Sequence, residues 1–284
     1  MSKKLRIVAF LLYISSQLSS AQPYVDLVSL QDFHGMPDNF TGDKSVNLES
    51  DWLGAQITYP HVFKDSSILA MNAGFEEWYF HSNKFRYRLN TVYLPVTYIF
   101  RSGIKSRLSF TAIPRMNGLP GSLFSNKNMQ YGGAVIYSYK IKNRLKLKGG
   151  LYYNKEFFGN YFLPLAGFEW KATNRLYIFG LLPNNLFLDF RIGSFMHTGF
   201  VFKGITASYR LNEIYPADYF SMEEGQLKYF TDFYITKNIV LNLEVGQTVS
   251  RKYGTGFLNE SPVNLNVNEG YFFKAGIYYR MWMK

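Results

Sequence analysis

The 284-residue chain contains no cysteine, so it has neither disulfide bonds nor thiolate metal ligands. Histidine is scarce as well, with four residues, His34, His61, His81 and His197. The sequence shows no cluster of His, Asp and Glu at the spacing of metal ligands. We therefore expect no metal site and no cofactor.

Long apolar runs are also missing. After residue 21, no stretch supplies the roughly 20 apolar residues that a membrane-spanning helix needs, which excludes a helical membrane protein. Aromatic residues, in contrast, make up 19% of the chain, with 23 Tyr and 26 Phe. Soluble β-proteins fill their cores with Val, Ile and Leu, whereas Tyr, Phe and Trp form the interfacial girdles of membrane barrels. The composition favours a membrane barrel over its alternative, a soluble β-sandwich or barrel.

The N-terminus has the three parts of a secretory signal peptide in order. Basic residues come first, an apolar run follows at residues 7–14, and small residues occupy positions 19–21. The apolar run is shorter than the roughly 18 residues of a membrane-spanning helix. We expect residues 1–21 to be a signal peptide and residues 22–284 to form one outer-membrane domain.

The C-terminal segment, residues 270–284, alternates apolar and polar side chains. Successive side chains of a strand point to opposite faces, so one face suits lipid and the other a wet lumen. The apolar face holds Ala275, Ile277, Tyr279, Met281 and Met283, and the other face holds Lys274, Gly276, Tyr278, Arg280 and Lys284. This pattern is typical of the closing strand of a transmembrane β-barrel.

The same segment resembles the β-signal that the barrel assembly machinery recognises in its clients. The residues that carry the resemblance are Lys274, Gly276, Tyr279 and Met281, in the order polar, glycine, hydrophobic, hydrophobic. The chain departs from the pattern by ending in Met283-Lys284 instead of an aromatic residue. The resemblance implies the assembly machinery as a partner during biogenesis.

Period-2 alternation recurs along the whole domain, with turn residues between the segments. The expected strands are 24–33, 45–60, 67–80, 89–100, 106–117, 129–141, 144–156, 162–172, 175–183, 185–192, 196–210, 226–236, 239–250 and 270–283. They predict an all-β fold, an up-and-down antiparallel barrel of about 14 strands. Twelve strands is the alternative, because the first segment and the pair around residues 181–185 are the weakest.

The connections alternate between short and long. Short ones contain Gly or Asn, as at residues 142–143 and 173–175, and suit tight turns in the periplasm. The longer ones lie near residues 34–44, 81–88, 118–128, 212–225 and 250–268, and we expect them outside the cell.

Charged side chains fall on the predicted lumen face of several strands. The cations are Arg107, Arg115, Lys140, Arg144, Lys146, Lys148, Lys171, Arg191, Lys228, Lys274 and Arg280, and the anions are Glu169, Asp189, Asp232 and Glu244. An open lumen with this excess of cations would favour anions. Ion pairs that plug a small barrel are the alternative reading.

An outer-membrane hydrolase comes third among the possible functions. It would need a nucleophile or an activated water served by His or paired carboxylates. His81 and Ser82 are neighbours in sequence and are poorly placed for a hydrogen-bonded dyad, and alternation sends Glu76 and Glu77 to opposite faces. The sequence predicts no catalytic residue and no enzyme.

Residues 163–171 (LPLAGFEWK) and 174–185 (NRLYIFGLLPNN), with the signal peptide and the terminal strand, resemble uncharacterised outer-membrane barrel proteins of the Bacteroidota. The resemblance implies the fold and the compartment but supplies no functional residues.

We therefore expect a monomer in the cell outer membrane that contacts its lipid and lipopolysaccharide. Its expected role is a passive pore for small anionic or amphipathic solutes, with a plugged structural or interaction barrel as the alternative. The chain has a net charge of +11, but its sequence contains no recognisable nucleic-acid-binding module. The expected export also argues against a nucleic-acid partner.

Overall fold

The computed structural model describes residues 24–40, 43–83, 85–212, 215–265 and 267–282. The predicted signal peptide, residues 1–21, and the final residues 283–284 lie outside these ranges. Within them, no helix is long and apolar enough to cross a bilayer.

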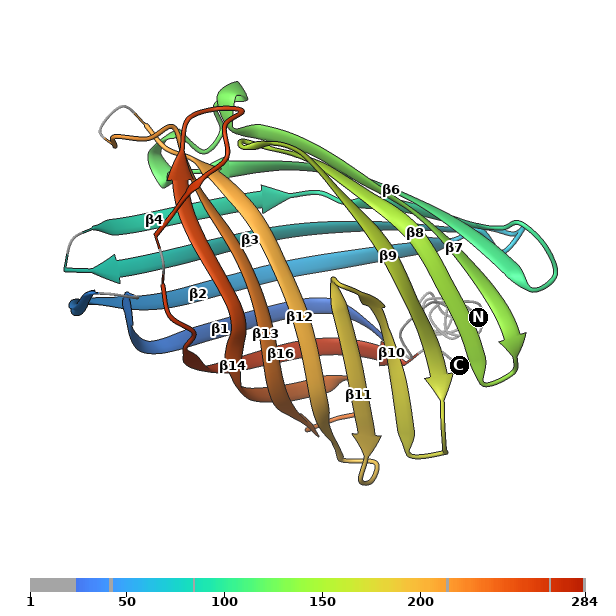
Figure 1. Cartoon of the computed structure of the whole chain (residues 1–284). Coiled ribbons are helices and arrows are strands. Elements are labelled where there is room, and N and C mark those ends of the chain that lie inside the picture. Colours follow the sequence, from blue (N-terminus) through green and yellow to red (C-terminus); the bar gives the residue numbers. More distant parts are fainter. Residues whose placement is uncertain (1–23, 41–42, 84, 213–214, 266, 283–284) are drawn as a thin grey trace, which may run out of the picture.

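The strands form a closed antiparallel barrel (Figure 1). They are β1 Tyr24–Phe40, β2 Asp43–Val62, β3 Ile68–Ser82, β4 Arg86–Tyr93, β5 Val96–Arg101, β6 Ser106–Gly118, β7 Met129–Lys142, β8 Leu145–Glu156, β9 Gly159–Lys171, β10 Leu176–Leu182, β11 Asn185–Arg191, β12 Met196–Arg210, β13 Tyr219–Tyr234, β14 Ile239–Gly256, β15 Val263–Asn264 and β16 Tyr271–Trp282. Two short 3-10 helices, η1 Pro120–Ser122 and η2 Asn126–Asn128, lie between β6 and β7.

The barrel wall has 14 strands, as predicted, and the alternative of twelve is wrong. Consecutive strands of the wall pair with each other, and β1 pairs with β16 to close the ring. The two-residue β15 pairs only with the end of β14 and is not part of the wall, where β14 pairs directly with β16. β4 and β5 both lie between β3 and β6 and form one strand interrupted at Leu94 and Pro95. Proline has no backbone N–H to donate to the ladder, which explains the interruption.

Side chains alternate between a lipid face and a lumen face, and β16 shows this most clearly. Ile277 and Tyr279 are 55% and 46% exposed, whereas Tyr278 and Arg280 are 8% and 3% exposed. The predicted faces of this strand are therefore observed over its described residues.

The two ends of the barrel differ in their connections. We call the end that carries the short turns, such as residues 143–144 and 192–195, the turn end, and the opposite end the loop end. The predicted long loops at 34–44, 212–225 and 250–268 are too long. β1, β13 and β14 extend into them because side chains near their outer ends pack inside the barrel, as Phe220 of β13 does with 0% exposure.

The wall is incomplete in its loop-end half, between β9 and β12 (Figure 1). β10 and β11 have seven residues each and turn back at residues 183–184. They cover β9 only from Ala166 to Lys171, and β12 only up to Lys203. Beyond that hairpin, β12 instead meets β6 across the barrel, where Arg210 pairs with Gly118.

Candidate functional site in the barrel interior

Arg280 is the centre of a polar network at the turn end. Its guanidinium donates from Nε to Asp26 Oδ1 at 2.6 Å and from Nη1 to Asp232 Oδ2 at 2.5 Å. The same group lies 3.7 Å from the centroid of the Tyr24 ring. The network joins β1, β13 and β16, so it ties together strands on both sides of the barrel closure.

A second group of ion pairs lies deeper in the lumen. Lys228 Nζ is 2.5 Å from Glu244 Oε2, and Lys274 Nζ is 3.8 Å from the same oxygen. All three side chains are less than a tenth exposed. A carboxylate shared by two ammonium groups offsets part of the cost of burying these charges.

The lysines predicted as a lumen triplet with Arg144 are both bound to one carboxylate. Lys146 Nζ is 3.0 Å from Glu169 Oε2, and Lys148 Nζ is 2.6 Å from Glu169 Oε1. Arg144 itself lies in the exposed turn before β8. Of the remaining predicted cations, Lys140 is exposed at the turn end and Arg107 is partly buried.

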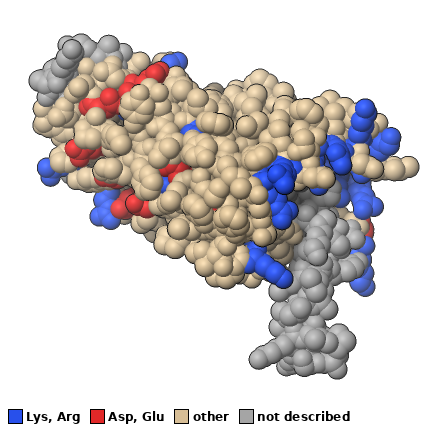
Figure 2. All heavy atoms as spheres, turned by 90° about the horizontal axis from the view of Figure 1, so that it is seen from below, with Lys and Arg blue, Asp and Glu red and all other residues tan. Residues whose placement is uncertain are grey.

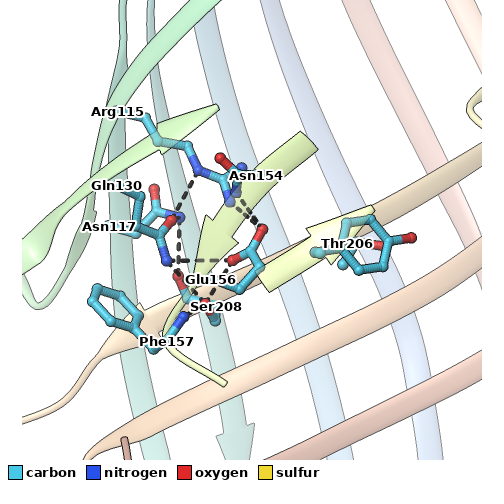
Figure 3. A network of polar contacts seen from close by, with 9 residues as sticks. Arg115, Asn117, Gln130, Asn154, Glu156, Phe157, Thr206 and Ser208 are labelled. Carbon is cyan, nitrogen blue, oxygen red and sulfur yellow. Dashed lines mark hydrogen bonds and ion pairs between the residues drawn. The ribbon is translucent and has the colours of Figure 1, made fainter. Parts of the chain in front are cut away.

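Arg115 belongs to a network around the buried Glu156, which Figure 3 shows. Glu156 accepts hydrogen bonds from Ser208 Oγ at 2.6 Å and from Asn154 Nδ2 at 2.6 Å, in addition to its ion pair with Arg115. Gln130 Nε2 donates to Ser208 Oγ at 3.0 Å. The network connects β6, β7 and β8 with β12.

The loop end of the lumen is filled by a cluster of aromatic and aliphatic side chains, which we call the aromatic cluster. Its buried members include Phe33, Leu48, Trp52, Trp78, Phe80, Tyr87, Leu89, Tyr209, Phe220, Met222, Tyr253 and Phe272. Trp78 and Phe80 stack with their rings 5.5 Å apart. Arg251 reaches this region and pairs with Asp38 at 3.1 Å and Glu224 at 3.5 Å.

Sequence reasoning missed the acids that balance the lumen cations. Asp38 and Glu224 fell within predicted loops, and Asp26 lay in the weakest predicted strand. Glu156 is the last residue of β8, and its carboxylate could have been assigned to the lumen face by continuing the alternation from Lys148. With these acids counted, the excess of cations in the lumen becomes much smaller.

A cavity of about 280 Å³, the lumen cavity, lies between the aromatic cluster and the ion pairs. Its lining is mixed, with indole and phenol rings beside polar and charged groups. The lining includes Trp52, Trp78, Glu76, Tyr93, Arg115, Lys203, Gln226 and Lys274. Such a lining suits a solute that has both an apolar and a polar part.

Exposed basic side chains gather at the turn end, where Figure 2 shows blue side chains over the right-hand end of the molecule. We call them the basic collar. Its exposed members are Arg101, Lys105, Lys140, Lys142, Arg144, Lys171, Arg175, Arg191 and Lys237. The collar explains much of the positive net charge without placing it inside the lumen.

Two of the four histidines lie beside aspartates. His197 Nδ1 lies 3.0 Å from Asp189 Oδ1 near the turn end, and His34 Nδ1 lies 2.5 Å from Asp51 Oδ1 on an exposed surface. Across the described part of the chain, no three His, Asp and Glu side chains gather as a metal site would require.

The predicted assembly residues lie on β16. Lys274 and Gly276 face the lumen, and Tyr279 faces lipid. A Cβ on Gly276 would lie 3.0 Å from the Tyr278 ring and 3.2 Å from Leu30 O, so a larger side chain would crowd the β1–β16 closure.

Replacing Gly276 or Tyr279 by Asp should therefore lower the amount of membrane-inserted, heat-modifiable protein by about tenfold. The first change crowds the closing strand, and the second places a charge in lipid. The exposed turn residue Asn143 offers a matched control, and Asn143→Asp should insert normally. Normal insertion of both β16 variants would remove the case for a terminal assembly signal.

No family model matches the sequence, and no curated protein matches it. Among solved structures, the chain is similar to an outer-membrane channel from Pseudomonas putida F1, with a TM-score of 0.51 and 9% identity, covering 89% of this chain and 93% of that one. The TodX monoaromatic hydrocarbon channel (a deltaS2 mutant) matches with a TM-score of 0.43 and 10% identity, covering 90% of both chains. The likeness to the Pseudomonas putida channel concerns the fold, which is that of outer-membrane β-barrels.

Proposed function

We propose that the protein is a passive channel of the outer membrane for small amphipathic solutes. The observation that carries the proposal is the lumen cavity, which pairs Trp52 and Trp78 with Lys203, Lys274 and other polar groups. A solute with an apolar body and a polar end would satisfy both parts of this lining.

The ion pairs favour an amphipathic solute over a free anion. Lys146, Lys148, Lys228, Lys274 and Arg280 all have carboxylate partners within 4 Å. Paired charges set up a weaker local field than isolated ones, so the lumen attracts small anions less than its count of cations implies. We therefore rank an anion-selective pore second, after a channel for amphipathic solutes.

A structural barrel without transport is the alternative function. The filling of the loop end by the aromatic cluster and of the turn end by the Arg280 network favours it. Under this alternative, the lumen cavity would be a packing defect and not a binding site.

Uptake of N-phenyl-1-naphthylamine, a neutral dye with an apolar aromatic body and a single polar N–H group, distinguishes these functions. Cells of a Gram-negative host that express the protein should accumulate the dye faster than cells that express the insertion-defective Tyr279→Asp variant. In planar bilayers, the purified protein should show little steady ion conductance. Unchanged dye uptake would favour the structural barrel.

An anion-selective conductance that is lost when Arg144, Lys146 and Lys148 are all replaced by Gln would instead favour the anion-selective pore. Membership of the Bacteroidota barrel family, residence in the outer membrane as a monomer and contact with lipopolysaccharide are parts of the same proposal.

A further inference from the structure

The loop-end half of β12 turns its lipid face toward protein. Phe200, Phe202, Gly204, Thr206 and Ser208 share one face of this strand, because its pairing with β13 runs without a register shift from Met196 to Arg210. Phe200 is 53% exposed, as a lipid-facing side chain should be. Ser208, on the same face, is 0% exposed.

The partners of Ser208 come from the lumen side of other strands. Its hydroxyl contacts Glu156 and Gln130. The opposite faces of β8 and β7 carry Leu151 and Tyr131, which are exposed as lipid-facing side chains should be. Figure 3 shows Glu156, Gln130 and Ser208 converging from these strands. The loop-end half of β12 therefore lies inside the curve of β7 and β8, with its lipid face against their lumen face.

A cavity of about 490 Å³, the lateral cavity, lies between these two faces. One wall consists of lumen-facing residues of β6 to β9, and the other contains lipid-facing residues of β12 and β13. The first wall includes Ile113, Ala134, Ile136, Tyr152, Leu163 and Leu165, and the second includes Phe202, Gly204, Thr206 and Gly225. Among the described residues that line it there is no Lys or Arg, and the carboxylates are those of Glu223 and Glu224, of which Glu224 pairs with Arg251 outside the lining.

The open side of this cavity faces the membrane. Its floor is the tip of the β10–β11 hairpin, with Leu181, Pro183 and Asn184, and above that tip no strand joins β9 to β12 among the described residues. Phe162, on the lipid face of β9 beside this opening, is 68% exposed, and Phe200, on the lipid face of β12 just below it where β12 still pairs with β11, is 53% exposed. The opening therefore lies next to lipid-facing side chains of both flanking strands.

We propose that the lateral cavity is a binding site for neutral, largely apolar small molecules that exchange directly with the outer leaflet. The apolar walls match such a ligand, and a described lining that holds carboxylates and no Lys or Arg disfavours an anion. Five residues, Ile113, Asn184, Gly204, Ile205 and Thr206, line both this cavity and the lumen cavity. The lateral cavity therefore supplies a membrane-side opening for the channel proposed above. Its role in transport rests on that proposed function, whereas its ligand binding does not.

Single cysteines test the opening, because the chain has no other thiol. In liposomes, Leu163→Cys and Thr206→Cys, from opposite walls, should react with bilayer-dissolved N-pyrenylmaleimide at rates close to that of the lipid-facing Val135→Cys. With a water-soluble sulfonated thiosulfonate, in contrast, both cysteines should react about tenfold more slowly than a cysteine at the loop residue Asn259. Met222→Cys, buried in the aromatic cluster, gives the labelling rate expected of a closed interior.

A bulky side chain should close the site. Ala134→Trp points into the lateral cavity and should slow the labelling of Leu163→Cys by N-pyrenylmaleimide about tenfold, whereas Val135→Trp, one residue along on the lipid face, should not. N-phenyl-1-naphthylamine should protect Leu163→Cys, and its sulfonated relative 1-anilinonaphthalene-8-sulfonate should not.

Labelling of both wall cysteines like Asn259→Cys, or like Met222→Cys, would overturn the membrane-facing opening. Labelling that Ala134→Trp leaves unchanged would overturn the site, and equal protection by the sulfonated dye would overturn the preference for neutral ligands. These results are independent of dye uptake by cells. If the channel function fails but the cysteines behave as described, the protein binds membrane-dissolved molecules without passing them on.

Discussion

Replacing Glu156 by Ala should lower the free energy of unfolding by about 3–5 kcal/mol. The carboxylate is buried and accepts hydrogen bonds from Ser208 and Asn154 as well as pairing with Arg115. Its removal leaves the Arg115 guanidinium, whose side chain is 12% exposed, without its carboxylate partner. Urea titration in detergent, followed by tryptophan fluorescence, measures the change.

The matched control for this prediction is Glu77→Gln. Glu77 pairs with Arg88 at 2.9 Å on the surface of the barrel, where the Arg88 side chain is 60% exposed. Exposed pairs of this kind contribute about 0–1 kcal/mol. A Glu156→Ala variant no less stable than Glu77→Gln would show that the network does not hold β12 against β6–β8.

Replacing Arg280 by Met should have a similarly large effect, about 3–5 kcal/mol, at the opposite end of the barrel. Arg280 neutralises both Asp26 and Asp232, and the Asp232 side chain is 3% exposed. Without the guanidinium, two nearby carboxylates repel each other where β1 closes on β16. The same urea titration measures this loss.

The double variant Arg280→Met with Asp232→Asn tests the reason for the loss. It removes the stranded charge while keeping the Asn242 contact, so it should recover part of the stability of the single variant. A double variant that is less stable than Arg280→Met alone would show that Arg280 acts through packing on Tyr24 and not through charge.

The strand pattern could be predicted from sequence because its cause is local. In β8, alternation of Lys146 and Lys148 with Leu147 requires water or polar partners on one face and lipid on the other. No tertiary information is needed for this step, and fourteen segments of this kind imply a barrel. The strand ends were harder to predict, because the extension of β13 to residue 219 depends on the packing of Phe220 and Met222 inside the aromatic cluster.

The interior could be predicted only in part. The lumen face of Arg280 follows from alternation, but its partner Asp26 lies 254 residues away and meets it only because the barrel closes. The shortness of the segments around residues 181–185 was visible in the sequence. Its consequence, a gap through which β12 moves inward until Ser208 meets Glu156, depends on the curvature of the whole wall.

Labelling on whole cells tests most directly whether the chain is an outer-membrane barrel with its loop end outside. Asn126 and Asn259 are exposed at the loop end, and Asn143 and Asn174 are exposed at the turn end. Tyr219, which the sequence placed in an outer loop, is buried and is unsuitable for this test.

A maleimide attached to a polyethylene glycol too large to pass porins should modify single cysteines at Asn126 and Asn259 on intact cells. It should modify cysteines at Asn143 and Asn174 only after the cells are broken, since short turns lie on the periplasmic side of such barrels. The reverse pattern, or equal labelling of all four cysteines before and after lysis, would contradict the account.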